Sequence, residues 1–297
     1  MINGDEKARE VWAEVLRNRR EKGIPYISFI DNVNNQAPQP YKDKGLRINQ
    51  SNLCVTGDTK ILTELGYKQI EDLEGQFIDV WNGEEWSNVQ IFKTGEAKEV
   101  YEVTLSNGTI IKATPEHKWY TQVGYERGMG ENKLKLEEKR TVELKEGDRM
   151  IKFDLPVIEG NKTLKHAYTQ GFFSGDGYCG DKPMESKIYL YQEKRELLPF
   201  LEVRNKYSKT SNGFETTEDK AITQFRDRLT IHTPLDLIQN KSFVPDATYT
   251  IKSRIEWLAG LFDSDGTLTD NKGSQSIQVG SVNRQFLIDT MLMLQTL

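Results

Sequence analysis

The pattern of apolar and polar residues divides this chain into three parts. Residues 5–22 place apolar side chains at helical spacing, which predicts one helix, and residues 24–53 show no apolar period of their own. Residues 54–155 hold short runs rich in β-forming residues, separated by glycine turns. Residues 160–297 mix longer helical runs with strands. We therefore expect a mixed fold in which a short leading segment precedes an all-β domain and then an α+β domain.

The β part is expected to consist of short strands joined by tight turns. The strongest turn signal is Asn107-Gly108, which lies between VTLS and TIIK and is typical of a type I′ hairpin turn. The predicted strands are Thr59–Leu62, Phe77–Trp81, Val89–Lys93, Val100–Leu105 and Thr109–Ala113.

Two predicted helices in the α+β part carry an internal repeat. They cover Thr163–Ser174 and Ser253–Ser264, and the second has Ser253 and Glu256 in the positions of a capping box. When GFFSGDG is aligned on GLFDSDG, Asp176 falls on Asp265, 89 residues later. The remaining elements predicted here are strands over Lys187–Leu190, Phe243–Ile251 and 274–280, a helix over Glu193–Val203, and a helix from Arg284 with Asn283 as its cap.

Composition narrows the class of protein. The chain of 297 residues has a formal net charge of −5, which argues weakly against nucleic-acid binding, although a local basic face can still bind DNA. Its apolar runs are too short for a membrane span, and its first residues lack a signal core, so we expect a cytoplasmic protein. The two cysteines, Cys54 and Cys179, cannot form a disulfide framework, and we expect Cys179 to pack in a core.

Cys54 opens the segment CVTGDTKILT, and a second segment, GTIIKATPEHKWYT, places Thr114 and His117 downstream, with His117 63 residues after Cys54. The two segments resemble the first two splicing blocks of inteins. The resemblance implies a Hint-type splicing domain over residues 54–155. It also implies that the Cys54 thiol attacks the carbonyl of Leu53 to form a thioester, because a thiolate is accessible near neutral pH. In this scheme His117 protonates the departing amide nitrogen, and Thr114 holds the amide or the carbonyl by hydrogen bonds.

Residues 24–53 resemble the large catalytic subunit of ribonucleotide reductase. The matching residues are Pro25, Tyr26, Phe29, Asp31, Val33 and Asn34, followed by INQSNL at 48–53. In that family the Asn before this Leu contacts substrate, which implies the same role for Asn52. The resemblance stops at Leu53, because VTGDTKIL stands where the family has a short acidic and apolar segment. Residues 1–53 are therefore expected to be a host segment without reductase activity of its own.

The repeated stretches LAGLFDSDG and TQGFFSGDG resemble the motif of the LAGLIDADG homing endonucleases, the first closely and the second loosely. The resemblance implies an endonuclease domain over residues 160–297, in which two motif helices pack side by side through small residues. Asp176 and Asp265 would then meet and bind Mg²⁺, which activates water for phosphodiester hydrolysis. The first copy departs from the second in having Ser174 where the second has Asp263.

Double-stranded DNA is the partner that this resemblance implies. Ten basic residues are spread through the region and could meet phosphates, although solvated surface charges explain any single one at least as well. They are Lys187, Lys194, Arg195, Lys206, Lys209, Arg226, Arg228, Lys241, Lys252 and Arg254.

Two alternatives remain beside the intein interpretation. One is a free-standing LAGLIDADG nuclease with a β accessory domain, and the other is a degenerate DNA-binding intein without activity. The closing splicing blocks, with their terminal His-Asn and following nucleophile, are not found before Leu297, and the second repeat is cut short. We therefore expect the chain to be a fragment whose C-terminal intein and reductase portions are missing, and which cannot complete splicing alone.

Overall fold

The computed structural model describes most of the chain beyond residue 53, and the fold is mostly sheet with some helices. Of residues 1–53, only Glu10, Ala13, Glu14 and Arg17 are described, and all four are helical. Asn52, Leu53 and the rest of the helix expected over 5–22 lie outside the described residues. The other described residues are 54–93, 95, 98–126, 133–180, 186–204, 207–209, 214–216, 221–271 and 273–297.

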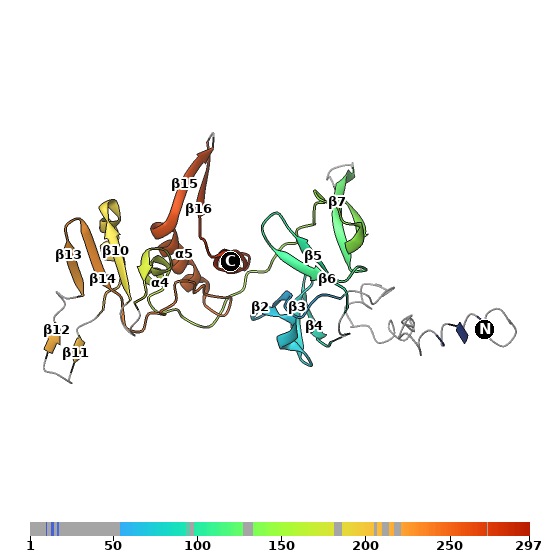
Figure 1. Cartoon of the computed structure of the whole chain (residues 1–297), viewed down its shortest axis with the longest axis horizontal. Coiled ribbons are helices and arrows are strands. Elements are labelled where there is room, and N and C mark those ends of the chain that lie inside the picture. The colour runs from blue at the N-terminus through green and yellow to red at the C-terminus, as the bar shows by residue number, and fades with distance from the viewer. Residues whose placement is uncertain are drawn as a thin grey trace.

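The first unit is built from short antiparallel strands (Figure 1). One sheet has the order β2-β1-β3-β4. Its strands are β1 (Lys60–Thr63), β2 (Gly66–Gln69), β3 (Phe77–Trp81) and β4 (Trp86–Gln90), with the 3-10 helix η1 (Ile70–Leu73) after β2. The prediction for β3 is confirmed residue for residue, and β1 is confirmed with a shift of one residue.

Two hairpins complete this unit. β5 (Tyr101–Thr104) pairs with β6 (Ile110–Ala113), and β7 (Lys118–Glu126) pairs with β8 (Lys133–Arg140), which precedes η2 (Thr141–Glu143). The hairpin at Asn107-Gly108 is confirmed, but the predicted type I′ turn is wrong. Only Gly108 has a positive φ, of 84°, and its N–H donates to the carbonyl of Leu105 at 2.9 Å. The loop therefore has only one residue, Gly108, in the left-handed conformation, whereas a type I′ turn needs two.

The second unit is organised around two helices, α4 (Ala167–Asp176) and α5 (Ile251–Asp265), which pack side by side. α5 starts two residues before its predicted start. Its N-cap is Thr250, whose hydroxyl accepts from the Ser253 N–H, so the predicted Ser253–Glu256 capping box is wrong. Instead, the Ser253 hydroxyl accepts from the Leu164 N–H at 3.0 Å and ties the segment before α4 to α5.

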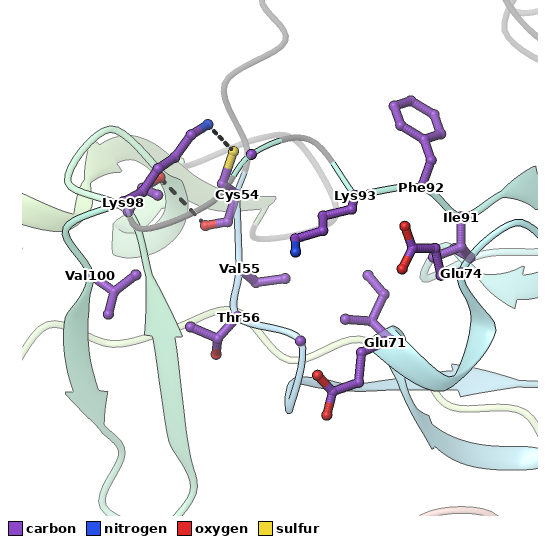
Figure 2. A pocket seen from close by; sticks show the side chains of 14 residues that line it. Cys54, Val55, Thr56, Glu71, Glu74, Ile91, Phe92, Lys93, Lys98 and Val100 are labelled. Carbon is purple, nitrogen blue, oxygen red and sulfur yellow. Dashed lines mark hydrogen bonds between the residues drawn. The ribbon is translucent and has the colours of Figure 1, made fainter.

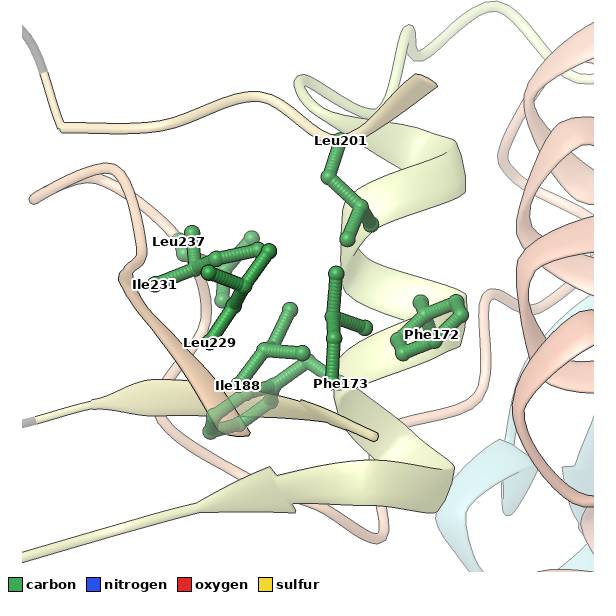
Figure 3. Packing of buried hydrophobic residues seen from close by; sticks show 8 residues of the cluster. Phe172, Phe173, Ile188, Leu201, Leu229, Ile231 and Leu237 are labelled. Carbon is green, nitrogen blue, oxygen red and sulfur yellow. The ribbon is translucent and has the colours of Figure 1, made fainter. Parts of the chain in front are cut away.

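An antiparallel sheet of order β13-β14-β10-β9 covers α4. Its strands are β9 (Gly177–Tyr178), β10 (Lys187–Tyr191), β13 (Ile222–Phe225) and β14 (Arg228–His232). Alternate residues of the central strands, Ile188, Leu190, Leu229 and Ile231, form a core with Phe172 and Phe173 of α4. Phe173 points from the helix toward these strands (Figure 3).

Two predictions between the repeats need correction. The segment Glu193–Val203 is not an α-helix but a series of 3-10 turns, η3 (Gln192–Phe200), which contains Pro199. Proline lacks an N–H and disfavours a continuous α-helix. Phe243–Ile251 is not a strand: the Asp246 carboxylate accepts from the Thr248 N–H at 2.9 Å and forms a turn there. A short hairpin of β11 (Tyr207–Lys209) and β12 (Phe214–Thr216) lies in the same region.

The chain continues into the hairpin of β15 (Gly266–Asn271) and β16 (Ser274–Val279) and then α6 (Arg284–Leu294). The strand expected over 274–280 is confirmed, and the Asn283 side chain caps α6 by accepting from the Phe286 N–H at 3.2 Å. Phe286 and Met293 of α6 complete a core with Trp257 and Leu261 of α5.

α6 also joins the two units, and the C-terminus lies between them in Figure 1. The Lys60 ammonium of β1 forms an ion pair with Asp289 at 2.9 Å, and the Tyr67 hydroxyl donates to Gln295 at 2.8 Å. The Arg284 guanidinium donates to the carbonyl of Gly108 at the tip of the β5–β6 hairpin. In the part of the chain that the structure describes, no helix has the length and apolar character of a membrane span.

Candidate functional site

The backbone of Cys54 lies against the end of the β5–β6 hairpin. Val55 forms an antiparallel bridge with Ala113, and the Thr56 N–H donates to the carbonyl of Lys112 at 3.2 Å. The Thr114 N–H donates to the Cys54 carbonyl at 3.1 Å, and the Thr114 hydroxyl donates to the same oxygen at 3.4 Å. The two segments singled out in the sequence are thus brought together, with Thr114 holding the peptide unit that follows the Leu53–Cys54 bond.

Asp58, in the Gly-Asp-Thr triplet, connects the turn after Cys54 to a neighbouring strand. Its carboxylate accepts hydrogen bonds from the Thr56 hydroxyl and from the Lys112 ammonium, the latter at 2.9 Å. The hydrogen bond from Thr56, followed by that from Lys112, lowers the pKa of Asp58. Because Lys112 belongs to β6, the charged Asp58 ties the turn after Cys54 to the hairpin that carries Thr114.

His117 lies half-buried beside the same backbone. Its N–H donates to the Thr114 carbonyl at 3.0 Å, its carbonyl accepts from the Thr141 N–H at 2.9 Å, and its ring lies 5.3 Å from that of Trp119. Burial lowers the pKa of His117, and a hydrogen bond with the Cys54 backbone opposes this shift. The ring Nδ1 is buried without a hydrogen-bond partner. A lowered pKa makes the imidazolium a stronger acid, so the ring can return a proton readily.

The Cys54 side chain lies at a pocket of about 460 Å³, lined also by Thr114, Lys98, Lys93 and Glu71 (Figure 2). The Lys98 ammonium donates to the Cys54 sulfur at 3.4 Å. Sequence reasoning missed Lys98, because no motif includes it and its place beside Cys54 depends on how the distant strands pair.

The second candidate site lies where α4 and α5 end. A Cβ atom on Gly171 would lie 1.8 Å from the Trp257 carbonyl oxygen, and one on Gly260 would lie 2.0 Å from that of Tyr168. The expected close packing through small residues is therefore confirmed. Asp176 and Asp265 are the last residues of the two helices. Burial raises the pKa of Asp265, and the nearby charge of Asp176 adds to this shift, while Lys194 and Lys241 oppose it.

Two lysines surround these carboxylates. The Lys194 ammonium donates to Asp176 at 2.6 Å and to the carbonyl of Ser264 at 2.5 Å, and the Lys241 ammonium donates to the carbonyl of Gly175 at 2.7 Å. Among the described residues no group of three or more His, Cys, Asp or Glu side chains is arranged to hold a metal ion. A pair of carboxylates still suits Mg²⁺, which commonly takes one or two protein carboxylates and completes its shell with water and phosphate.

The outer face of the β13-β14-β10-β9 sheet is basic and aromatic. Lys187 pairs with both Tyr178 and His232, so these three lie together on one face. The Arg228 guanidinium lies 4.8 Å from the ring centre of Tyr189. Such a face suits nucleic acid, because cations meet phosphates and rings can stack. Arg254, one of the ten basic residues, is fully buried and does not contribute to such a face.

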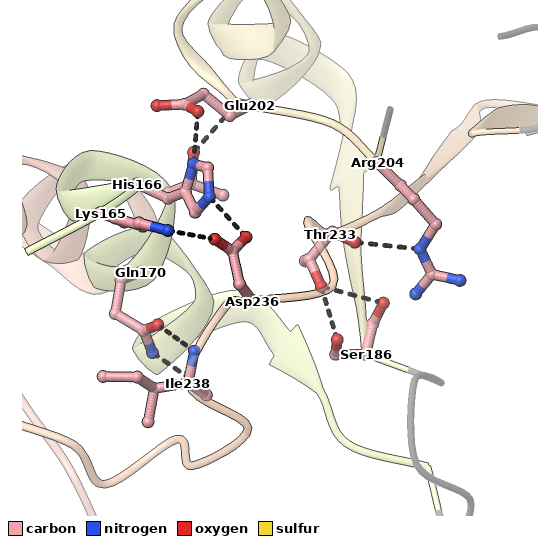
Figure 4. Close-up of polar contacts among 10 residues, drawn as sticks. Lys165, His166, Gln170, Ser186, Glu202, Arg204, Thr233, Asp236 and Ile238 are labelled. Atoms are coloured by element: carbon pink, nitrogen blue, oxygen red, sulfur yellow. Dashed lines mark hydrogen bonds and ion pairs between the residues drawn. The ribbon is translucent and has the colours of Figure 1, made fainter. Parts of the chain in front are cut away.

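A polar network fixes the start of α4 (Figure 4). His166, with a φ of 55°, hydrogen-bonds Glu202 through Nδ1 and Asp236 through Nε2, the latter at 2.8 Å. The buried Gln170 side chain accepts from the Ile238 N–H at 2.9 Å and donates to the Ile238 carbonyl at 3.0 Å. These bonds hold the helix in register with the 233–240 segment. Cys179, expected in a core, is exposed, because it follows β9 at the edge of the sheet.

Comparison with known proteins gives two family matches and several relatives. Residues 2–56 match the ribonucleotide reductase barrel domain, and residues 252–297 match a LAGLIDADG-like domain. The ribonucleoside-diphosphate reductase large subunit of Invertebrate iridescent virus 6 is 41% identical over 294 residues, which are 97% of this chain and 29% of that protein. The ribonucleoside-diphosphate reductase NrdEB subunit alpha of Bacillus subtilis (strain 168) is 27% identical over 330 residues, with the same shares of 97% and 29%.

A third relative has a different name. The ATP-dependent DNA helicase Hel308 of Methanocaldococcus jannaschii is 25% identical over 255 residues, which are 79% of this chain and 20% of the helicase. The chain thus spans under a third of the length of each of these curated relatives.

Proposed function

Since the chain carries a ribonucleotide reductase large-subunit barrel segment at its N-terminus and a LAGLIDADG-like domain at its C-terminus, we propose that residues 54–297 belong to a self-splicing insert within the reductase. The insert combines a splicing unit, residues 54–155, with a DNA endonuclease unit, residues 160–297. The barrel match ends at residue 56, close to the proposed junction at Leu53–Cys54.

The arrangement around Cys54 carries this proposal. Two hydrogen bonds from Thr114 fix the Cys54 carbonyl, and His117 lies against the same backbone. A cysteine that only filled a core would need neither a half-buried histidine nor a pocket at its sulfur. Here the thiol faces a pocket, and the histidine has a lowered pKa.

In the proposed reaction the Cys54 sulfur attacks the carbonyl carbon of Leu53. A carbon–sulfur bond forms, the Leu53–Cys54 amide bond breaks, and the proton lost from the thiol is balanced by a proton gained by the Cys54 nitrogen. His117 delivers that proton, because its imidazolium is a stronger acid than an exposed one. Thr114 keeps the Cys54 peptide unit in place while the nitrogen departs.

The helicase relative supports an insert that is independent of its host. Its match covers 79% of this chain, and residues 1–53 make up less than a fifth, so most of the matched stretch necessarily lies beyond the proposed junction. A helicase and a reductase differ in their named activities, yet they share this stretch. A mobile insert explains that pattern.

Mass spectrometry of the purified chain with and without a strong thiol or hydroxylamine tests the splicing proposal. We expect release of residues 1–53, abolished in Cys54→Ala, strongly slowed in His117→Ala, and unchanged in the control Cys179→Ala. An intact Leu53–Cys54 bond under all thiol conditions, in a folded chain, would contradict the proposal and favour a free-standing nuclease with a β accessory domain.

A second activity, cleavage of double-stranded DNA, is favoured by the Asp176–Asp265 pair at the end of closely packed helices. Bound Mg²⁺ would activate water and stabilise the leaving oxygen. Asp176 and Asp265 would hold the metal, Lys194 and Lys241 would neutralise charge near the phosphate, and Lys187 and Arg228 would bind the DNA backbone.

A plasmid that carries the uninterrupted reductase coding sequence around the Leu53 codon tests this second activity. We expect Mg²⁺-dependent cutting that is lost in Asp176→Asn and in Asp265→Asn. Retained DNA binding without cutting by the unaltered protein would favour a degenerate insert that only binds DNA.

A further inference from the structure

Lys98 lies shortly before a strand that is paired beside Cys54. It lies three residues before β5, whose first residue, Tyr101, pairs with Ala113 of β6. Ala113 in turn forms the bridge with Val55, next to Cys54. The contact of 3.4 Å between the Lys98 ammonium and the Cys54 sulfur therefore follows from strand pairing that also places Thr114 on Cys54 (Figure 2).

Gly95 gives the Lys98 side chain its space. A Cβ atom on Gly95 would lie 2.6 Å from Cε and 3.1 Å from Nζ of Lys98. The end of the lysine side chain thus runs directly over the glycine backbone on its way to the sulfur. A Cβ at position 95 would therefore force the end of the Lys98 side chain to shift.

We propose that Lys98 is a positioning residue that holds the Cys54 sulfur as a thiolate, and that Gly95 provides the space for it to do so. An ammonium group donates hydrogen bonds and accepts none, so it favours the charged acceptor, the thiolate, over the neutral thiol. The thiolate is the nucleophilic form of cysteine. The consequence for cleavage at Leu53–Cys54 rests on the proposed splicing function, whereas the effect on the thiolate does not.

Lys98 keeps its own proton throughout this step. The thiol proton leaves to water, the thiolate attacks the Leu53 carbonyl carbon, and the nitrogen of Cys54 takes a proton from His117, which water reprotonates. The step is therefore a rearrangement without net gain or loss of protons, and Lys98 contributes only by stabilising the sulfur anion before attack.

Alkylation of Cys54 by iodoacetamide, followed by mass spectrometry between pH 6 and 9 in a Cys179→Ser background, measures the thiolate directly. In Lys98→Met we expect alkylation at pH 7 to slow several-fold, because the sulfur loses one charge-assisted hydrogen bond. Lys98→Arg should retain most of the wild-type rate. Lys93→Met removes a cation from the same pocket and serves as the matched control.

Gly95→Ala separates positioning from folding. The three atoms nearest its Cβ all belong to the flexible end of the Lys98 side chain, so the fold should be preserved while alkylation slows as in Lys98→Met. Alkylation at the wild-type rate in both Lys98→Met and Gly95→Ala would overturn the inference.

Thiol-induced release of residues 1–53, measured on the same variants, distinguishes the two proposals. Slower alkylation together with slower release supports both of them. Slower alkylation in Lys98→Met with no release even from the unaltered chain would leave Lys98 as the positioning residue and reject the splicing function.

Discussion

Gly171 of α4 lies directly against Trp257 of α5, so that a Cβ atom on the glycine would be 1.8 Å from the tryptophan carbonyl oxygen. The relationship is nearly symmetric, since a Cβ on Gly260 of α5 would be 2.0 Å from the Tyr168 carbonyl oxygen of α4. Backbone meets backbone at both positions, and no side-chain rotation can relieve a larger residue. This contact sets the spacing of the two helices and therefore of Asp176 and Asp265 at their ends.

Gly171→Ala and Gly260→Ala should each lower the free energy of unfolding by about 1–3 kcal/mol, the usual cost of overpacking a core. Each should also reduce DNA cutting, because separated helices would separate the two carboxylates. Urea unfolding and plasmid cleavage measure the two effects. Gly280→Ala is the control, because a Cβ there meets nothing within 4 Å. Wild-type stability and cutting in both helix variants would show that the helices can move apart without cost.

Arg254→Leu should destabilise the packing of α5 against the segment that links the two units and against the C-terminal residues. The Arg254 guanidinium is fully buried and donates to the carbonyl of Ile158 and to the hydroxyl of Thr296, the latter at 2.9 Å. Leucine fills part of the space but leaves the Ile158 carbonyl without this donor, at a cost of about 1–3 kcal/mol. Urea unfolding measures the loss. Lys252→Leu removes an exposed cation from the same helix, and its stability should stay close to wild type.

Residues whose role follows from local pattern were predicted well. β3 was predicted residue for residue, and Asn283 was identified as the cap of α6, because alternation and capping are properties of short segments. The approach of Gly171 and Gly260 was implied by the resemblance to the LAGLIDADG family. By contrast, the strand predicted over Phe243–Ile251 is wrong. Phe243, Val244 and Tyr249 instead pack against the α5–α6 core from a turning segment.

In the candidate sites too, the residues that lie in local motifs could be predicted, and the one that depends on distant strand pairing could not. Cys54, Thr114 and His117 could be singled out because they lie in two recognisable segments, and Asp176 and Asp265 because they end a repeated motif. Lys98 could not be found from the sequence. Its contact with Cys54 depends on the pairing of Tyr101 with Ala113 and of Ala113 with Val55, which no local pattern specifies.

Stability should fall as the pH drops below about 6.5, partly because of His117. Burial holds the pKa of His117 below its ordinary value of 6.5 in the folded chain. As the pH falls through 6.5, this histidine therefore binds a proton in the unfolded chain before it does so in the folded chain. The folded chain has its full stability above pH 6.5 and loses part of it until the pH reaches the lower pKa of the folded state. The difference in urea unfolding between wild type and His117→Gln should shrink as the pH goes from 7.5 to 5.

His232 provides an internal comparison for this pH dependence. Burial, with the charges of Arg204 and Lys187, also lowers its pKa, so His232→Gln should remove a separate part of the same slope. Because the two residues lie in different units, their effects should be additive. A slope unchanged in the double variant would show that neither histidine is kept neutral by folding.

Mg²⁺ should stabilise the folded chain by binding at Asp265. Without the metal, the charge of Asp265 should lower the melting temperature. Desolvation, to which the nearby charge of Asp176 adds, raises the pKa of Asp265 and makes its charged form unfavourable in the metal-free fold. With EDTA, Asp265→Asn should therefore melt at a higher temperature than wild type. With Mg²⁺, wild type should gain several degrees and the variant little, since binding to the folded state adds to its stability. Asp270→Asn, on the exposed β15–β16 hairpin, should respond to Mg²⁺ like wild type. An equal Mg²⁺ shift in wild type and Asp265→Asn would mean that the metal binds elsewhere.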